Sequence, residues 1–229
     1  MCIRDSSRPQ VLKKEEDGEL KEPFEIATLD VPDDAVGACT QKLAARKGTM
    51  QDMMQDGSGR TRLVYRIPSR GLIGFRGEML TDTRGEGILN TLFDGWDTDV
   101  GFIQGRVRGA MVADRTGKTK AYSLYNLQPR GELFVKPQEE VYEGMIVGLH
   151  VRSNDLNVNV VKGKQLTNIR SSGADEKLIL APPRQLTLET AMDFIDDDER
   201  VEVTPSTIRL RKAVLPANMR SIVRGERKK

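Results

Sequence analysis

The residues best suited to chemistry lie in a polar stretch of the C-terminal half. A short alternating strand, residues 153–160, runs into residues 162–173, which are mostly Lys, Arg, Asn, Gln, Ser, Thr and Gly. Such a segment offers too little apolar area to offset the entropy lost on ordering. Its cations, amides and hydroxyls suit the phosphates and sugars of RNA. The pattern therefore predicts either an RNA contact or a solvated surface loop.

The composition indicates a soluble chain with a substantial core. Its 229 residues are enough for two domains, and 38% are hydrophobic and 31% charged. Aromatic residues make up only 5%, which argues against an RNA platform built on base stacking. The net charge is only +2, so any basic surface must come from charges that are segregated in the fold.

The two cysteines, Cys2 and Cys39, stand in different contexts and form no disulfide framework, which suits a reducing compartment. No apolar run is long enough to cross a bilayer, and the first residues do not form a signal peptide. We therefore expect a cytoplasmic protein without a membrane partner.

Catalytic patterns are weak. The sequence Gly117-Lys118-Thr119 invites a phosphate-loop interpretation, but Val112 stands where that loop needs another Gly, so a hairpin is favoured. The single histidine, His150, lies in an apolar strand with no nearby cysteine, which disfavours a metal site. The acidic run 196–199 lacks calcium-loop spacing and predicts a solvated turn, and the glycines of 71–77 are best explained by packing.

The N-terminal residues show no pattern that joins them to the rest of the chain. Residues 1–6 resemble the leader seen on translated environmental assemblies. We expect residues 1–22 to be a non-native leader with a remnant of a preceding domain, in which 7–12 form a last strand and 13–22 a charged linker. On this interpretation the chain is a fragment whose upstream part is missing.

Residues 23–100 predict a ferredoxin-like domain of order βαββαβ, so the fold class is α+β. The expected strands are 24–31, 49–55, 60–67 and 87–96. One helix follows Pro32 and ends at a Gly48 C-cap, and a second runs from Pro68 through Met79.

Residues 101–212 predict a mostly β domain with one helix. A hairpin is expected between 110–113 and 121–124, with further strands at 133–135, 145–151 and 178–180. Thr187 should cap a helix over 188–195, and 200–203 should pair with 207–211. Residues 213–229 are expected to be a basic, disordered tail.

Five motifs, in order along the chain, resemble the BipA/TypA family of ribosome-associated translational GTPases. They are Ile67-Pro68-Ser69-Arg70-Gly71-Leu72-Ile73-Gly74-Phe75-Arg76, Tyr142-Glu143-Gly144-Met145-Ile146-Val147-Gly148, Arg152-Ser153-Asn154-Asp155-Leu156, Leu166-Thr167-Asn168-Ile169-Arg170 and Phe194-Ile195-Asp196-Asp197-Asp198-Glu199. The likeness is collinear from about Ser7 to Lys212.

The resemblance implies that residues 23–97 are similar to the fifth domain of elongation factor G and that 101–212 form the family's own C-terminal domain. The family's GTP-hydrolysing domain, with its GTP and Mg, would lie upstream. The resemblance thus implies no cofactor, metal or catalytic residue in this fragment. The parent protein would act in ribosome assembly and in translation under stress.

The resemblance also implies a role for the 157–174 loop, which in this family approaches large-subunit rRNA and the acceptor arm of A-site tRNA. We expect Lys162, Lys164 and Arg170 to neutralise phosphates. Hydrogen bonds to sugar or phosphate would come from Gln165, Asn168, Ser171 and Ser172. Gly163 and Gly173 would let the backbone approach closely. The chain is expected to be a monomer.

Two other classes of function stay open. One is a regulatory module whose ferredoxin-like domain binds a small ligand, although no polar pocket signature is evident. The other is a free-standing enzyme, which the absence of a recognisable acid–base or nucleophile set disfavours.

Overall fold

The structure, a computed structural model, describes residues 4–55, 57–103, 105–163 and 178–220. The chain divides into two compact units. Residues 9–105 form one, here called the ferredoxin-like unit, and residues 1–8 with 106–229 form the other, here called the C-terminal unit.

The ferredoxin-like unit is one antiparallel sheet covered by helices. Its elements in chain order are β2 (Lys14–Glu16), β3 (Glu19–Pro32), the 3₁₀ turn η1 (Asp33–Ala35), α1 (Val36–Ala45), β4 (Thr49–Gln55), β5 (Arg60–Pro68), the 3₁₀ turn η2 (Ser69–Leu72), α2 (Phe75–Asp82) and β6 (Ile88–Thr98). The central strand β3 pairs with β5 and β6, and β5 pairs with β4. This βαββαβ arrangement confirms the predicted α+β, ferredoxin-like fold.

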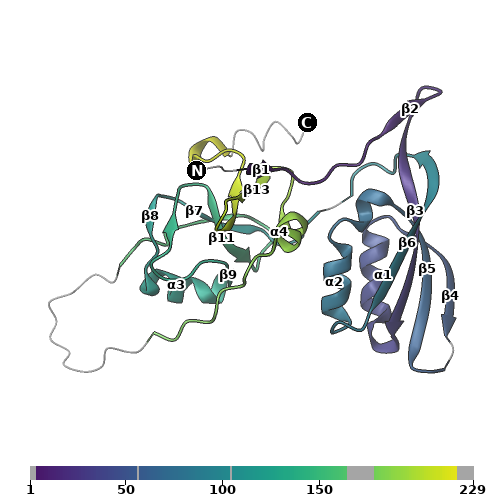
Figure 1. Cartoon of the computed structure of the whole chain (residues 1–229), viewed down its shortest axis with the longest axis horizontal. Helices are drawn as coiled ribbons and strands as arrows, with labels where there is room; N and C mark the ends of the chain where they lie inside the picture. The colour runs from purple at the N-terminus through teal and green to yellow at the C-terminus, as the bar shows by residue number, and fades with distance from the viewer. Residues whose placement is uncertain (1–3, 56, 104, 164–177, 221–229) are drawn as a thin grey trace. The chain divides into compact units, whose positions relative to one another are not determined.

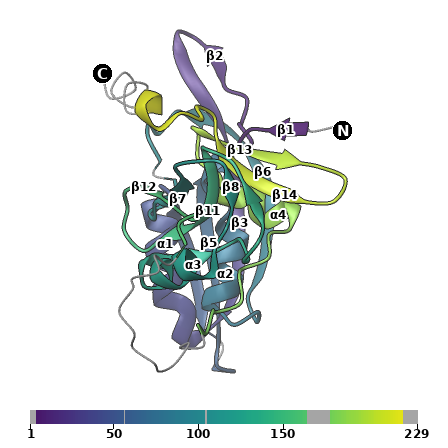
Figure 2. The ribbon, with the colours of Figure 1, turned by 90° about the vertical axis from the view of Figure 1, so that its left-hand side faces the viewer.

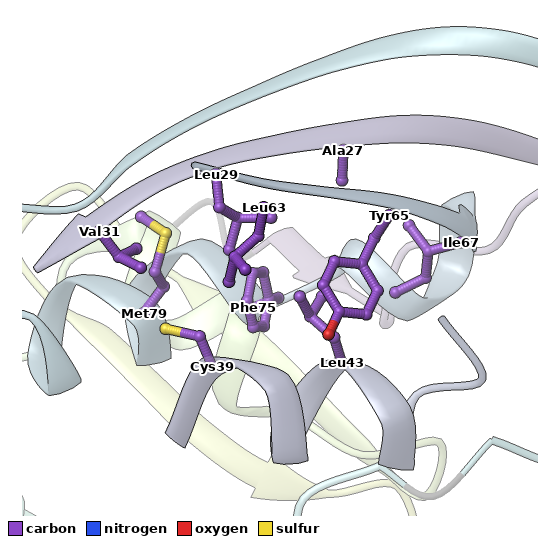
Figure 3. Close-up of a cluster of buried hydrophobic side chains, with 10 residues drawn as sticks. All are labelled: Ala27, Leu29, Val31, Cys39, Leu43, Leu63, Tyr65, Ile67, Phe75 and Met79. Carbon is purple, nitrogen blue, oxygen red and sulfur yellow. The ribbon is translucent and has the colours of Figure 1, made fainter. Parts of the chain in front are cut away.

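The core of this unit lies between the sheet and the two helices, which cover the same face (Figure 1). Alternation along β3 and β5 places Leu29, Leu63 and Tyr65 on the helix side. There they meet Cys39 and Leu43 of α1 and Phe75 and Met79 of α2, all nearly or wholly inaccessible to solvent (Figure 3). Burial raises the pKa of the Cys39 thiol, with the nearby Asp82 carboxylate adding to the effect.

The second helix begins later than the sequence predicts. After η2, Ile73 is extended and Gly74 has φ 75°, so the chain turns before α2 starts at Phe75. The glycine at 71 has the packing role expected of it, because a Cβ there would lie 2.9 Å from the Arg46 carbonyl oxygen.

The first helix also ends differently. Lys47, not Gly48, adopts the left-handed conformation, with φ 65°. Gly48 instead donates its N–H to the Leu43 carbonyl at 2.9 Å, and a Cβ on it would lie 3.0 Å from that oxygen. The close approach of the Leu43 carbonyl oxygen thus explains why position 48 is glycine.

The N-terminal residues are more ordered than predicted. The interpretation of 13–22 as a linker is wrong, because β2 and β3 form a hairpin around Asp17 and Gly18, which have φ 56° and 78°. Residues 7–12 form no strand. Residues 4–6, predicted to be an unattached leader, form β1 (Arg4–Ser6), which pairs with β13 (Glu199–Val203) of the C-terminal unit.

The C-terminal unit is built on a mixed sheet of order β1-β13-β14-β11-β7-β12, whose strands are labelled in Figure 2. A further strand, β9, also pairs with β11. The remaining elements of this unit are β7 (Ala110–Ala113), β8 (Gly117–Lys118), α3 (Ala121–Leu127), the 3₁₀ turn η3 (Gln128–Arg130), β9 (Gly131–Leu133), β10 (Glu140–Val141), β11 (Met145–His150), β12 (Leu156–Val158), α4 (Leu188–Phe194) and β14 (Ile208–Lys212).

Several predictions for this unit are confirmed. The strands β13 and β14 pair as a hairpin, and Thr187 caps α4 by accepting a hydrogen bond from the Thr190 N–H. The apolar side of α4, with Ala191 and Phe194, packs into a core beneath the sheet.

Other predictions for this unit are wrong. Residues 121–124 form helix α3 rather than a strand, so no hairpin links them to β7, and β8 pairs with β10 instead. Residues 178–180 form no strand. The tail is ordered as far as the structure describes it, since Ala213 donates to the Asp198 carbonyl and Ala217 to the Glu143 carboxylate.

The acidic run after α4 forms the predicted turn at Asp197 and Asp198, whose side chains reach solvent, but its last residue, Glu199, does not. Glu199 is fully buried, receives hydrogen bonds from Arg106 at 2.8 and 2.9 Å, and lies 2.8 Å from the Lys212 ammonium. Burial alone would raise the pKa of Glu199, but these two cations outweigh it and hold the pKa below its ordinary value. Burial would likewise lower the pKa of Lys212, yet Glu199, Asp155 and Asp198 raise it.

Candidate nucleic-acid interface

The polar segment predicted to contact RNA leaves the core at the end of β12. Val158 and Val160 are buried, and the Val160 carbonyl accepts a hydrogen bond from the Lys120 N–H at 2.9 Å. Between them, the Asn159 side-chain oxygen accepts from the N–H groups of Val161 and Lys162, each at 3.0 Å. These bonds fix the backbone as far as Lys162.

Helix α3, which the sequence did not predict, also holds this point. The Ser123 hydroxyl, on a residue that is 5% exposed, donates to the Lys162 carbonyl. Val161 packs closely on Gly117, where a Cβ would lie 2.8 Å from a Val161 methyl group. The backbone of Lys162 is therefore held by α3 and by the β8 strand while its side chain is exposed.

Of the predicted contact residues, the structure places Lys162 and Gly163. Both are exposed, and the space around a Cβ built on Gly163 is open, so packing within the described residues does not require glycine there. The other predicted residues lie outside the described residues: Lys164, Gln165, Asn168, Arg170, Ser171, Ser172 and Gly173.

The chain returns to the same core after residue 177. Leu180 packs against the cluster that holds Val158 and Val160, and the Arg184 N–H donates to the Leu133 carbonyl at 2.8 Å. The two ends of the polar segment are thus attached to one hydrophobic core.

Three further exposed lysines stand on backbone next to the start of the segment: Lys118, Lys120 and Lys136. Lys120 is bonded to Val160 through its N–H, and the neighbouring Thr119 hydroxyl donates to the Lys136 carbonyl at 2.7 Å. Lys118 faces Glu140 at 3.9 Å, an exposed pair with weak attraction. Sequence reasoning missed this group because Lys136 is distant in the chain from Lys118 and Lys120 and comes next to them through the hydrogen bonds of Thr119 to the Lys136 and Glu139 carbonyls.

The rest of the described chain offers little else for chemistry. Within residues 4–163 and 178–220, apart from positions 56 and 104, no three His, Cys, Asp or Glu side chains are placed to hold a metal ion. Among the same residues no helix is long and apolar enough to span a membrane.

Comparison with known proteins matches each of the two units to a known domain family. Residues 108–217 match the family model of the TypA/BipA C-terminal domain, and residues 19–101 match that of the elongation factor G C-terminus. The first match extends past Lys212, where the resemblance found in the sequence stopped.

Curated relatives agree. The chain is 51% identical over 216 residues to the large ribosomal subunit assembly factor BipA of Escherichia coli (strain K12) and 46% identical over 215 residues to that of Bacillus subtilis (strain 168). Each alignment covers 93% of this chain and 35% of the relative, so the chain spans about a third of the length of these relatives. With both domain models matched in the expected order, the chain belongs to the TypA/BipA family and corresponds to the C-terminal part of its members.

Proposed function

We propose that this chain is the ribosome- and RNA-binding portion of a translational GTPase that assists assembly of the large ribosomal subunit. The observation that carries the proposal is the polar segment whose two ends are fixed to one core and whose first cation, Lys162, is exposed among Lys118, Lys120 and Lys136. The name shared by the relatives, large ribosomal subunit assembly factor, supports the choice of partner.

In this proposal the segment contacts large-subunit rRNA and the acceptor arm of A-site tRNA. Lys162, Lys164 and Arg170 neutralise phosphates, and the neighbouring amides and hydroxyls bond to sugar and phosphate. The fixed base lowers the entropy lost on binding because the backbone as far as Lys162 is already held in place.

The chemistry of GTP and Mg belongs, in the same proposal, to the part of the family's proteins that this chain does not span. The chain itself performs no catalysis and acts as a cytoplasmic monomer during ribosome assembly or under stress.

Co-sedimentation of the chain with purified large ribosomal subunits across a salt series tests the proposal. Binding should weaken with salt, since each neutralised phosphate contributes about 0.7 to 0.9 to the slope of log affinity against log salt. The triple variant Lys162→Glu/Lys164→Glu/Arg170→Glu should bind more weakly and with a shallower slope.

A matched control carries the same charge change on exposed cations of the ferredoxin-like unit, Lys47→Glu/Arg76→Glu/Arg84→Glu. Equal losses in the two triple variants would mean that overall charge, and not the polar segment, governs binding. No binding by the unaltered chain would remove the proposed function.

A further inference from the structure

A second cationic region lies at the end of β11, where the sequence pattern marked no RNA contact. A hollow of about 500 Å³ opens there between η3 and the turn after β11. Its polar lining comes from Arg130, His150, Arg152 and Asn154.

The backbone around this hollow is held tightly. Gly109 donates its N–H to the Arg152 carbonyl at 2.7 Å and accepts from the His150 N–H at 2.8 Å, and Val151 donates to the Arg130 carbonyl at 2.9 Å. A Cβ on Gly109 would lie 2.1 Å from the Asn154 carbonyl oxygen, so only glycine permits this approach. The two arginines therefore start from fixed, adjacent positions.

The charges of these arginines are not balanced by neighbouring carboxylates. No described Asp or Glu forms an ion pair with Arg130 or Arg152, whereas other arginines of this unit do have a carboxylate partner: Arg8, Arg106, Arg115, Arg184 and Arg211. Asp155, three residues after Arg152, is occupied by the Lys212 ammonium at 2.7 Å and by the Ala110 N–H at 2.8 Å. Glu132, two residues after Arg130, pairs with Arg184 at 3.6 Å. The hollow thus presents positive charge that an anion can use.

The imidazole of His150 also lines the hollow, beside the two arginine side chains. It is only 5% exposed, and its Nδ1 lies 2.6 Å from the Asn154 carbonyl oxygen. Because a carbonyl oxygen only accepts hydrogen bonds, Nδ1 carries the proton and donates. In the neutral ring Nε2 is then the unprotonated nitrogen, which accepts a hydrogen bond, as from a ribose hydroxyl, and the ring orientation is fixed.

The remaining walls are apolar and come from Pro129, Val151 and Leu156. The volume is larger than a bare phosphate ion needs and falls in the range of sites for small organic ligands. A lining that contains both cations and apolar groups suits a phosphate that carries a sugar or a base.

We propose that this hollow binds a phosphate group, held by Arg130 and Arg152 beside His150, and that a nucleotide of an RNA chain supplies it. The occupation by RNA rests on the function proposed above, whereas the phosphate site itself does not. It gives the C-terminal unit a second point of RNA contact with its own residues, separate from the 157–174 segment.

The imidazole of His150 reports on this site, because the chain contains one histidine and so gives one imidazole Cε1–H signal in a proton–carbon-13 NMR spectrum. We would titrate the whole chain with inorganic phosphate, with adenosine 5′-monophosphate and with a short single-stranded RNA, using sodium chloride at matched ionic strength as reference. Phosphate, the nucleotide and the RNA should each shift the signal, and chloride should not.

The variant Arg130→Gln/Arg152→Gln should weaken each of these responses at least tenfold. The control Arg76→Gln/Arg84→Gln, which removes the same charge from exposed positions of the other unit, should leave them unchanged. The triple variant of the polar segment should also keep the response of His150 to the RNA.

The outcomes separate the two proposals. If phosphate shifts the signal no more than chloride does, the phosphate site is refuted, even where co-sedimentation upholds ribosome binding. If inorganic phosphate and the nucleotide bind but the RNA leaves the signal unchanged, RNA is overturned as the ligand. A response to RNA in a chain that does not bind ribosomes upholds the site and removes the proposed function.

Discussion

Arg106 and Glu199 form a two-pronged ion pair, in which Nη1 meets Oε2 at 2.9 Å and Nη2 meets Oε1 at 2.8 Å. Arg106 also donates to the Phe194 carbonyl and lies over the Phe194 ring, 4.0 Å from its centroid. The pair therefore joins the residue at which the chain re-enters the C-terminal unit to the end of α4 and the first residue of β13.

Removing one partner of this pair should destabilise the unit strongly. Arg106→Gln leaves the Glu199 carboxylate buried with less compensation, and we expect a loss of about 3 kcal/mol in the free energy of unfolding, measured with urea. The control Glu140→Gln removes an exposed carboxylate 3.9 Å from Lys118 and should cost below about 1 kcal/mol. Similar losses in both variants would contradict a stabilising role for the buried pair.

The same network predicts how stability depends on pH. The pKa of Glu199 is held below its ordinary 4.5, so its contribution is complete above pH 4.5 and is lost as the pH falls toward the lowered value. The pKa of Lys212 is raised above 10.5, so its contribution is complete below pH 10.5 and is lost above the raised value. The stability advantage of the parent chain over Glu199→Gln, measured by urea unfolding at each pH, should shrink in acid as Glu199 is protonated and again above the raised pKa of Lys212. An advantage that grew in acid would refute the assignment.

Replacing either of two glycines by alanine should change the stability of the chain, in opposite directions at the two positions. A Cβ on Gly109 would lie 2.1 Å from the Asn154 carbonyl oxygen, so Gly109→Ala should cost at least about 1–3 kcal/mol. Gly37 lies inside α1 with open space around it, so Gly37→Ala should stabilise by about 0.5–1 kcal/mol. Thermal unfolding of the two variants beside the parent chain should show a lower melting temperature for Gly109→Ala and a higher one for Gly37→Ala. If Gly109→Ala melted at the same temperature as the parent chain, the turn around Gly109 would be able to accommodate a Cβ at little cost.

The base of the polar segment should depend on Asn159. The change Asn159→Ala removes the acceptor for two N–H groups and should cost about 1–2 kcal/mol. Amide hydrogen exchange at Val161 and Lys162 should speed up, while exchange in the ferredoxin-like unit should stay the same. Unchanged exchange at these two amides would mean that Ser123 alone fixes the base.

The first unit was predictable because its two central strands, β3 and β5, alternate around a sheet with one buried face. Leu63, Tyr65 and Ile67 point inward in register with β3, and the order βαββαβ follows from that pattern. The boundaries were less accurate, since the left-handed turn fell on Lys47 and Gly74 rather than on Gly48.

The second unit was harder because its order depends on distant residues. Residues 121–124 have the pattern of a strand, yet they form a helix whose Ser123 holds the Lys162 carbonyl and whose Leu124 enters the core. Glu199 has the sequence context of a solvated acid because its partners, Arg106 and Lys212, are not its sequence neighbours. A local pattern carries no sign of such pairings.

The strand β1 gives the chain an unusual connectivity. It precedes residues 9–105 and pairs with β13, which comes after them, so the ferredoxin-like unit is an insertion within the C-terminal unit. Because β1 ends the sheet order, it shields the backbone of β13. A chain beginning after Ser6 would expose that ladder of N–H and carbonyl groups, and any extended segment of another polypeptide could add itself there as a strand.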